Sequence, residues 1–294
     1  MPVKSIPMER SSQTAGNAVG DGGLVGGAQS LALRTEILTV RFGGLTALDR
    51  VSVNVQPGIV TAFIGPNGAG KSTLLNAVSG FQAVSDGEVF LQGRQITHLP
   101  AHTRIALGMA RTFQDNEVLP RLTVLENTLL GLQNQWGENV IRLLTRPRRV
   151  QAQRRASVER ALSILDSVGL RSFANSMAGG LSYGQQKLLV LARMLATDAN
   201  LFMLDEPGAG LSSRYIDQVG DILRKMVDLG KTVVLVDHNM RLVMNYAQRI
   251  VVLHHGQVIA VGTPAEIRSH PDVLACYLTH RKIGGEASAA AAGG

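Results

Sequence analysis

Cysteine is almost absent from this sequence, since Cys276 is the one cysteine among 294 residues. A chain with a single thiol forms no internal disulfide, which excludes the disulfide-stapled class of secreted proteins and fits a reducing compartment. Because the neighbours of Cys276 are mostly apolar, we expect it to be a buried, small hydrophobic side chain.

Long hydrophobic runs are lacking as well. No apolar stretch approaches the ~20 residues that cross a bilayer, and the N-terminus has no continuous apolar segment of the secretory type. We therefore predict neither a transmembrane helix nor a secretory signal. With 45% hydrophobic residues, the sequence predicts a globular chain of one large domain or two small ones.

Acidic residues are outnumbered, and the excess of positive charge is local. The net charge is +7, and residues 139–160 carry +6 of it, from seven arginines against Glu159. This basic segment, Arg142–Arg160, is compatible with anionic lipid head groups, with an acidic loop of a partner or with a solvated helical face. The rest of the chain is nearly neutral.

What the sequence does contain is a phosphate-binding loop. Residues 65–73 read GPNGAGKST and fit the pattern G-x-x-x-x-G-K-[ST]. An apolar run (59–64) precedes the loop and a helix-compatible run (73–78) follows it, which is the context that the pattern needs. Backbone N–H groups and a helix N-terminus would bind phosphate there. The predicted nucleotide-binding residues are Gly65, Pro66, Asn67, Gly68, Ala69, Gly70, Lys71, Ser72 and Thr73.

Within this loop the side chains have separate tasks. Lys71 would reach the β- and γ-phosphates, and the Ser72 hydroxyl would bind Mg²⁺. A second run, LFMLDEP (201–207), is an apolar strand that ends in two acids, where open α/β sheets bind ligands. We expect Asp205 to hold Mg²⁺ and Glu206 to act as the general base toward water.

A second helix N-terminus follows the sequence LSYGQQ (181–186). Ser182 stands at the expected N-cap, and Gly184 leaves the backbone open to close approach. The run predicts either a further anion site or an ordinary capped helix, and local sequence does not separate the two.

The order of elements predicts an α/β fold. Early strands at 36–42, 51–55, 88–91 and 94–96 suit an antiparallel edge sheet, and the stretch 101–195 has a mainly helical pattern. Three short apolar runs (201–204, 232–236 and 250–253) suit buried parallel strands. The prediction is a P-loop ATPase core with a mostly parallel sheet, an antiparallel β edge subdomain and a helical insertion subdomain.

Together these runs resemble the ATP-binding subunits of ABC transporters. GPNGAGKST is similar to Walker A, LFMLDEP to Walker B and LSYGQQ to the family signature, with Tyr183 in place of a glycine. The resemblance implies that Gln114 in RTFQ contacts Mg²⁺ and the membrane partner, that His238 in VDHNM steadies the γ-phosphate, and that Phe42 stacks on adenine.

The resemblance also implies the assembly. Two ATPase chains would pair head to tail, so that Ser182, Gly184 and Gln185 of one chain complete the ATP site of the other. It further implies transmembrane permease subunits, an indirect solute-binding protein, and a peripheral place at the cytoplasmic face of the inner membrane. A heterodimer of ATPase subunits is favoured over a homodimer, and no nucleic acid is expected.

Closer similarity to one subset of the family indicates which solute the transporter carries. The stretches RFGGLTALDRVS, LTVLEN and PDVLACYL resemble the branched-chain amino acid importers. Related urea, short-amide and lipopolysaccharide systems are alternatives, and the basic segment keeps a soluble ABC ATPase that acts on nucleic acid as a rival. Two positions depart from the family pattern, where Ser212 and Asn239 replace an expected Asp.

The domain boundaries follow from composition. Residues 1–30 predict a disordered leader, residues 31–282 the ABC ATP-binding domain with its helical subdomain at about 101–195, and residues 283–294 a flexible tail.

Overall fold

A computed structural model describes residues 31–112, 118–132 and 147–276. The predicted leader, the predicted tail and Gln114 lie outside these residues. The strands are β1 Leu33–Phe42, β2 Leu45–Val55, β3 Val60–Ile64, β4 Asp86–Leu91, β5 Arg94–Gln95, β6 Met109–Arg111, β7 Leu201–Asp205, β8 Thr232–Val236, β9 Arg249–His254 and β10 Gln257–Gly262. The α-helices are α1 Lys71–Ser79, α2 Ala101–Ala106, α3 Val124–Leu129, α5 Pro147–Ser167, α6 Tyr183–Ala196, α7 Ser213–Asp228, α8 Met240–Tyr246 and α9 Pro264–Ser269.

A six-stranded sheet forms the centre of the molecule, in the order β10-β9-β3-β8-β7-β6. β9, β3, β8, β7 and β6 run parallel, and β10 pairs antiparallel with β9. Every residue of β3, β7 and β8 is buried, as is typical of parallel strands that are covered on both faces. The predicted parallel core is therefore confirmed.

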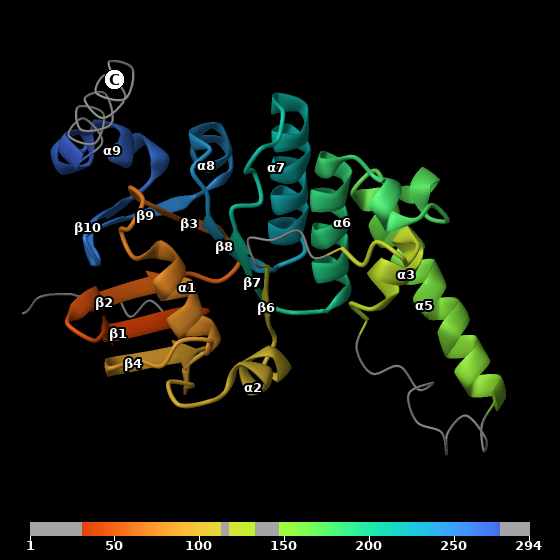
Figure 1. Ribbon diagram of the computed structural model, residues 1–294, viewed down its shortest axis with the longest axis horizontal. Helices are drawn as coiled ribbons and strands as arrows, with labels where there is room; N and C mark the ends of the chain where they lie inside the picture. Colours follow the sequence, from red (N-terminus) through yellow and green to blue (C-terminus); the bar gives the residue numbers. More distant parts are fainter. Residues whose placement is uncertain (1–30, 113–117, 133–146, 277–294) are drawn as a thin grey trace, which may run out of the picture.

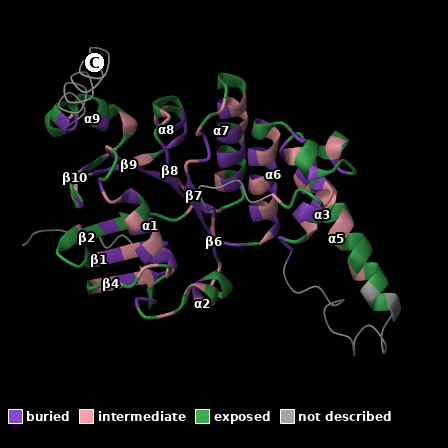
Figure 2. Ribbon diagram, in the orientation of Figure 1, coloured by how far each residue is buried: buried purple, intermediate pink, exposed green. Residues whose placement is uncertain are grey.

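The two faces of this sheet belong to different layers. In β8, Val233 and Leu235 join the helices α6, α7 and α8 in one hydrophobic cluster. Val234 and Val236 join α1 and the antiparallel sheet in the other cluster. This alternation follows from the period of two in a strand, and Figure 2 shows the buried sheet between its covering elements.

The second sheet has the order β2-β1-β4-β5 and is antiparallel, as predicted. Figure 1 shows α1 between it and the central sheet. The predicted helical region is carried by α3, α5 and α6, which contact one another. In Figure 1 they lie beyond the β6 edge of the central sheet, away from the antiparallel sheet.

The sequence patterns missed two strands. β6 lies inside the stretch with a mainly helical pattern and pairs with β7. Its three residues, Met-Ala-Arg, are too few to show a period of two. β10 follows a tight turn at His255-Gly256, and that glycine between two β-branched runs is a hairpin signal that could have located it.

Cys276 is buried, as predicted, and burial raises the pKa of its thiol. In the described part of the chain no helix combines the length and the apolar character that a membrane crossing requires.

Arg104 of α2 is a fully buried cation that binds only carbonyl oxygens in its recorded hydrogen bonds. Its guanidinium donates to Ala77 O (2.8 Å), Val78 O (2.6 Å), Thr97 O (2.8 Å) and Leu99 O (2.8 Å). The first two oxygens belong to the last turn of α1, where the helix dipole favours positive charge. Arg104 therefore anchors the end of the helix that begins at the phosphate loop.

We expect Arg104→Met to lower the free energy of unfolding by about 3 kcal/mol, because it leaves several buried carbonyl groups without donors. Urea unfolding measures the change. The control is Arg241→Met, which removes a half-exposed ion pair with Asp217 and should cost no more than about 1 kcal/mol. Equal losses in the two variants would contradict the anchoring role.

Candidate functional site

The phosphate loop has a backbone that only glycine permits at two of its positions. Gly65 has φ of 150° and Gly70 has φ of 98°. A Cβ at Gly65 would collide with the carbonyl oxygen of Leu253, and one at Gly70 would lie 2.8 Å from Ala47 O. The loop therefore passes too close to β9 and β2 for any side chain at these positions.

Lys71 begins α1 and points back into the loop. Its ammonium donates to Gly65 O (2.8 Å) and Pro66 O (2.9 Å). Burial lowers the pKa of Lys71, and the nearby Glu206 and Asp205 act in the opposite direction. The cation is thus held between the loop and the acids at the end of β7.

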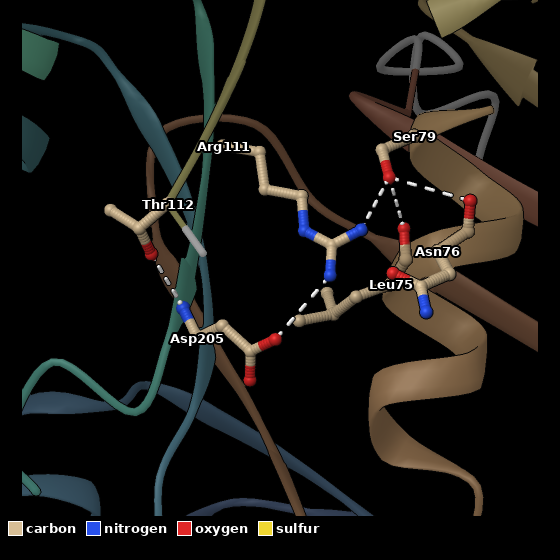
Figure 3. A network of polar contacts seen from close by, with 6 residues as sticks. All are labelled: Leu75, Asn76, Ser79, Arg111, Thr112 and Asp205. Carbon is tan, nitrogen blue, oxygen red and sulfur yellow. Dashed lines mark hydrogen bonds and ion pairs between the residues drawn. The ribbon is translucent and has the colours of Figure 1, made fainter. Parts of the chain in front are cut away.

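Asp205 is the last residue of β7 and is almost wholly buried. Its backbone N–H donates to Thr112 Oγ1 (2.9 Å), and its Oδ2 accepts from Arg111 Nη2 (3.4 Å) (Figure 3). Among the described residues its Oδ1 has no hydrogen-bond partner. Burial raises the pKa of this carboxyl, and Arg111 opposes that shift.

Glu206 follows Asp205 in a strained conformation. Its φ is 51°, a value that costs a non-glycine residue roughly 1–2 kcal/mol. The turn carries the Glu206 side chain toward the end of β8, where its Oε1 lies 3.0 Å from His238 Nε2. The two residues that sequence analysis singled out for catalysis are therefore in direct contact.

Asp237 is a buried residue that sequence analysis did not single out. Its Oδ2 accepts from Gly208 N–H (2.7 Å) and its Oδ1 from Asn239 N–H (2.7 Å). Burial raises the pKa of its carboxyl, against the effect of the two donors. Asp237 thereby joins the loop after Glu206 to the loop that carries His238. Its position in the sequence, between an apolar strand and His238, was the signal that could have identified Asp237 as a site residue.

A cavity of about 490 Å³ connects these groups. Its lining includes most of the predicted residues, namely Phe42, Asn67, Gly68, Ala69, Gly70, Lys71, Ser72, Thr73, Glu206 and His238. Leu45 and His255 line it as well and were not predicted. Phe42 and Leu45 are exposed apolar side chains at the β1–β2 turn, which suits an aromatic base.

The phosphate loop is also tied to the β9–β10 turn. Gly256 N–H donates to Ala69 O (3.1 Å), and Asp49 N–H donates to Gly256 O (2.9 Å). A Cβ at Gly256 would lie 2.7 Å from Ala47 O. The turn therefore joins the phosphate loop to β2.

Ser182 and Gly184 lie at the start of α6 and do not line the cavity. Ser182 is the N-cap, as predicted, and forms a capping box with Gln185, whose Oε1 accepts from Ser182 N–H (2.9 Å). A Cβ at Gly184 would meet the Tyr215 ring at 2.6 Å, so the chain's own packing also requires glycine. Tyr183 Oη donates to Ala209 O (3.3 Å).

One departure from the expected family pattern has a local reason. Asn239 is the N-cap of α8 and its side chain accepts from Leu242 N–H, which Asn does as well as Asp. Ser212 is the N-cap of α7 without a side-chain cap bond, and nothing in the structure explains it further.

The site thus gathers its parts from the ends of three strands. β3 leads into the phosphate loop, β7 ends at Asp205 and β8 leads to His238. These ends lie side by side because Asp205 and Phe63 both pair with Val236. Ligands of open parallel sheets bind at such carboxyl ends. Gln114 lies outside the described residues.

The sequence matches the family model described as ABC transporter over residues 48–209, which is more than half of the chain. The chain belongs to the ATP-binding subunits of ABC transporters. A second family model, for the branched-chain amino acid ATP-binding cassette transporter, matches residues 257–278 of this subunit.

Relatives and solved structures agree with this assignment. The subunit is 39% identical over 242 residues to the high-affinity branched-chain amino acid transport ATP-binding protein BraF of Pseudomonas aeruginosa, covering 82% of this chain and 95% of BraF. It is similar to the ADP conformation of MJ1267, an ATP-binding cassette of an ABC transporter, with 33% identity, a TM-score of 0.72, and 84% and 98% coverage of the two chains. It is also similar to a dimeric, post-hydrolysis structure of the cassette MJ0796 bound to ADP and Pi, with 26% identity, a TM-score of 0.66 and coverage of 79% and 98%.

We expect Asp237→Asn to lower the free energy of unfolding by about 1–3 kcal/mol, because one amide oxygen cannot accept from two N–H groups that approach from different sides. Urea unfolding measures the loss. Asp228→Asn, at an exposed aspartate of α7, should stay within about 0.5 kcal/mol of the parent. A loss no larger than that of the control would show that Asp237 does not brace the two loops.

Proposed function

We propose that the chain is the ATP-hydrolysing subunit of an ABC importer for branched-chain amino acids. The observation that carries the hydrolytic role is the meeting of the phosphate loop, Glu206 and His238 at one cavity. The substrate rests on the match of residues 257–278 to the branched-chain family model and on the similarity to BraF.

ATP would bind with its phosphates against the loop. N–H groups from Asn67 to Thr73 and the N-terminus of α1 provide donors for oxygen anions. Lys71 would turn from the carbonyl oxygens of Gly65 and Pro66 to the β- and γ-phosphates. At the other end of the cavity Phe42 would stack on adenine, with Leu45 beside it.

Mg²⁺ would be held by Ser72 and Asp205, with Gln114 as a further ligand. The residues fit such an ion, because Ser72 lines the cavity and Asp205 has a buried oxygen without a partner in the described part of the chain. Bound there, Mg²⁺ would neutralise charge on the β- and γ-phosphate oxygens.

Glu206 is the proposed general base. It would accept a proton from the attacking water as the water's oxygen approaches the γ-phosphorus, which is worth about 10²–10⁴ in rate. His238 contacts the same carboxylate and would donate a hydrogen bond to the γ-phosphate. The strained backbone at Glu206 supports this role, since strain gathers at functional sites.

A second ATPase chain would complete each site. Ser182, Gly184 and Gln185 do not line the cavity of their own chain. Because Ser182 is exposed at the start of α6, this end of the helix would face the γ-phosphate bound by another chain. The Gln185 side chain is engaged in the capping box, so its contribution would come from the helix N-terminus that it stabilises. We propose a heterodimer with a different ATPase subunit.

The remaining partners are transmembrane permease subunits, with a solute-binding protein reached through them. The chain would sit at the cytoplasmic face of the inner membrane as a peripheral subunit. Dimer closure on ATP and reopening after hydrolysis would pass to the permeases through the helical region.

We expect Glu206→Gln to lower steady-state ATP hydrolysis by about 10²–10⁴ while ATP still binds, because the amide cannot take the proton from water. Phosphate release and binding of a fluorescent ATP analogue measure the two properties. Glu159→Gln, at an exposed glutamate of α5, is the control and should hydrolyse ATP normally. Near-normal turnover in Glu206→Gln would remove Glu206 from the role of base.

Deletion of the gene in its source organism tests the transport role. We expect high-affinity leucine, isoleucine and valine uptake to be lost, and to return with the wild-type chain but not with Glu206→Gln. If the deletion abolished urea uptake and left branched-chain amino acid uptake intact, urea would replace these amino acids as the proposed solute. Normal uptake of all these solutes, with copurification of nucleic acid that falls steeply over 50–200 mM salt, would favour the nucleic-acid rival.

A further inference from the structure

We propose that Arg111 is a positioning residue of the metal site, which fixes the Asp205 carboxylate relative to the helix that carries Ser72. This inference rests on the proposed ATP and Mg²⁺ site. Arg111 is the last residue of β6 and directly precedes Thr112, whose Oγ1 accepts a hydrogen bond from the Asp205 backbone N–H. It has no role in the nucleotide contacts described above.

The guanidinium of Arg111 bridges two elements that hold the proposed metal ligands. Nη1 donates to Ser79 Oγ (2.6 Å), in the last turn of α1, and Nη2 donates to Asp205 Oδ2 (3.4 Å), at the end of β7 (Figure 3). Ser79 Oγ in turn donates to Leu75 O (2.6 Å). The bridge therefore runs from the backbone of α1 to the carboxylate.

This bridge leaves one carboxylate oxygen for other use. Arg111 engages Oδ2, while Oδ1 is buried and has no partner within the described ranges. Both side chains of the pair are nearly inaccessible, at 6% and 4% exposure, so water does not loosen them. Arg111 thus holds the carboxylate in one rotation and presents Oδ1.

Arg104 is a second buried arginine, and its contacts differ from those of Arg111 in the way that distinguishes a positioning residue from one that only stabilises the fold. The recorded hydrogen bonds of Arg104 all go to backbone carbonyls, so they stabilise the chain path alone. The bonds of Arg111 to Ser79 and Asp205 reach side-chain oxygens, and Asp205 is a proposed metal ligand. Groups that orient metal ligands alter metal affinity by about 10–100-fold when changed.

Charge and geometry act in opposite directions here. The positive charge of Arg111 repels a nearby cation, whereas its hydrogen bonds orient the carboxylate that binds the cation. Arg111→Lys keeps the charge but replaces a planar fork with one ammonium on a flexible stem, which cannot hold both oxygens in the same geometry. This variant therefore tests geometry at constant charge.

The experiment measures the affinity of the full-length chain for a fluorescent ATP analogue, once in excess EDTA and once in excess Mg²⁺. We expect Arg111→Lys to weaken binding in Mg²⁺ by about tenfold and to leave binding in EDTA unchanged. Ser79→Ala, which removes the α1 end of the bridge, should shift binding in the same direction by less. Arg160→Lys alters an exposed Arg–Asp pair and is the matched control.

The outcomes are distinct. A wild-type chain that binds the analogue equally with and without Mg²⁺ overturns the proposed metal site itself, and the inference with it. A Mg²⁺-dependent wild type with an unchanged Arg111→Lys overturns the inference alone. Equal weakening in EDTA and Mg²⁺, together with a lower unfolding midpoint, also overturns it, because that result marks general support rather than positioning.

Discussion

Burial of the central sheet on both faces is the constraint on which the site depends. With α6, α7 and α8 on one face and α1 on the other, a slip of one residue in β3, β7 or β8 would move each side chain from the layer it packs in to the opposite one. Their carboxyl ends are therefore fixed side by side. The phosphate loop, the two acids and His238 lie close together because they follow these neighbouring strand ends.

Two buried polar side chains connect the elements around those strand ends. Asp237 joins the two loops that carry Glu206 and His238, and Arg111 joins Asp205 to the end of α1. Each connection uses a buried charged group with specific donors or acceptors, so the loss of one partner would leave the other buried and unsatisfied. Glu206 and His238, the residues proposed for catalysis, are in contact within this frame.

Much of this was predictable from the sequence, and the reasons are local. Glycine spacing around Lys71 and an apolar strand before Asp205 report short-range requirements, so the phosphate loop, the acids and the parallel core could be read directly. The contacts of Arg111 and Asp237, and the place of His255 in the cavity lining, depend on pairing between distant segments, which leaves no periodic pattern in the local sequence. The β6 strand was not predicted for the same reason, because its three residues form a strand through their pairing with β7.

The tie between Gly256 and the phosphate loop has a consequence for how the protein is made. Ala69 leaves the ribosome early. The Gly256 N–H that donates to its carbonyl oxygen, and the β9 strand beside β3, are synthesised much later. Chains grow from the N-terminus at a few residues per second, on the order of 5–20. A nascent chain that has not reached Gly256 therefore lacks part of the frame around the phosphate loop.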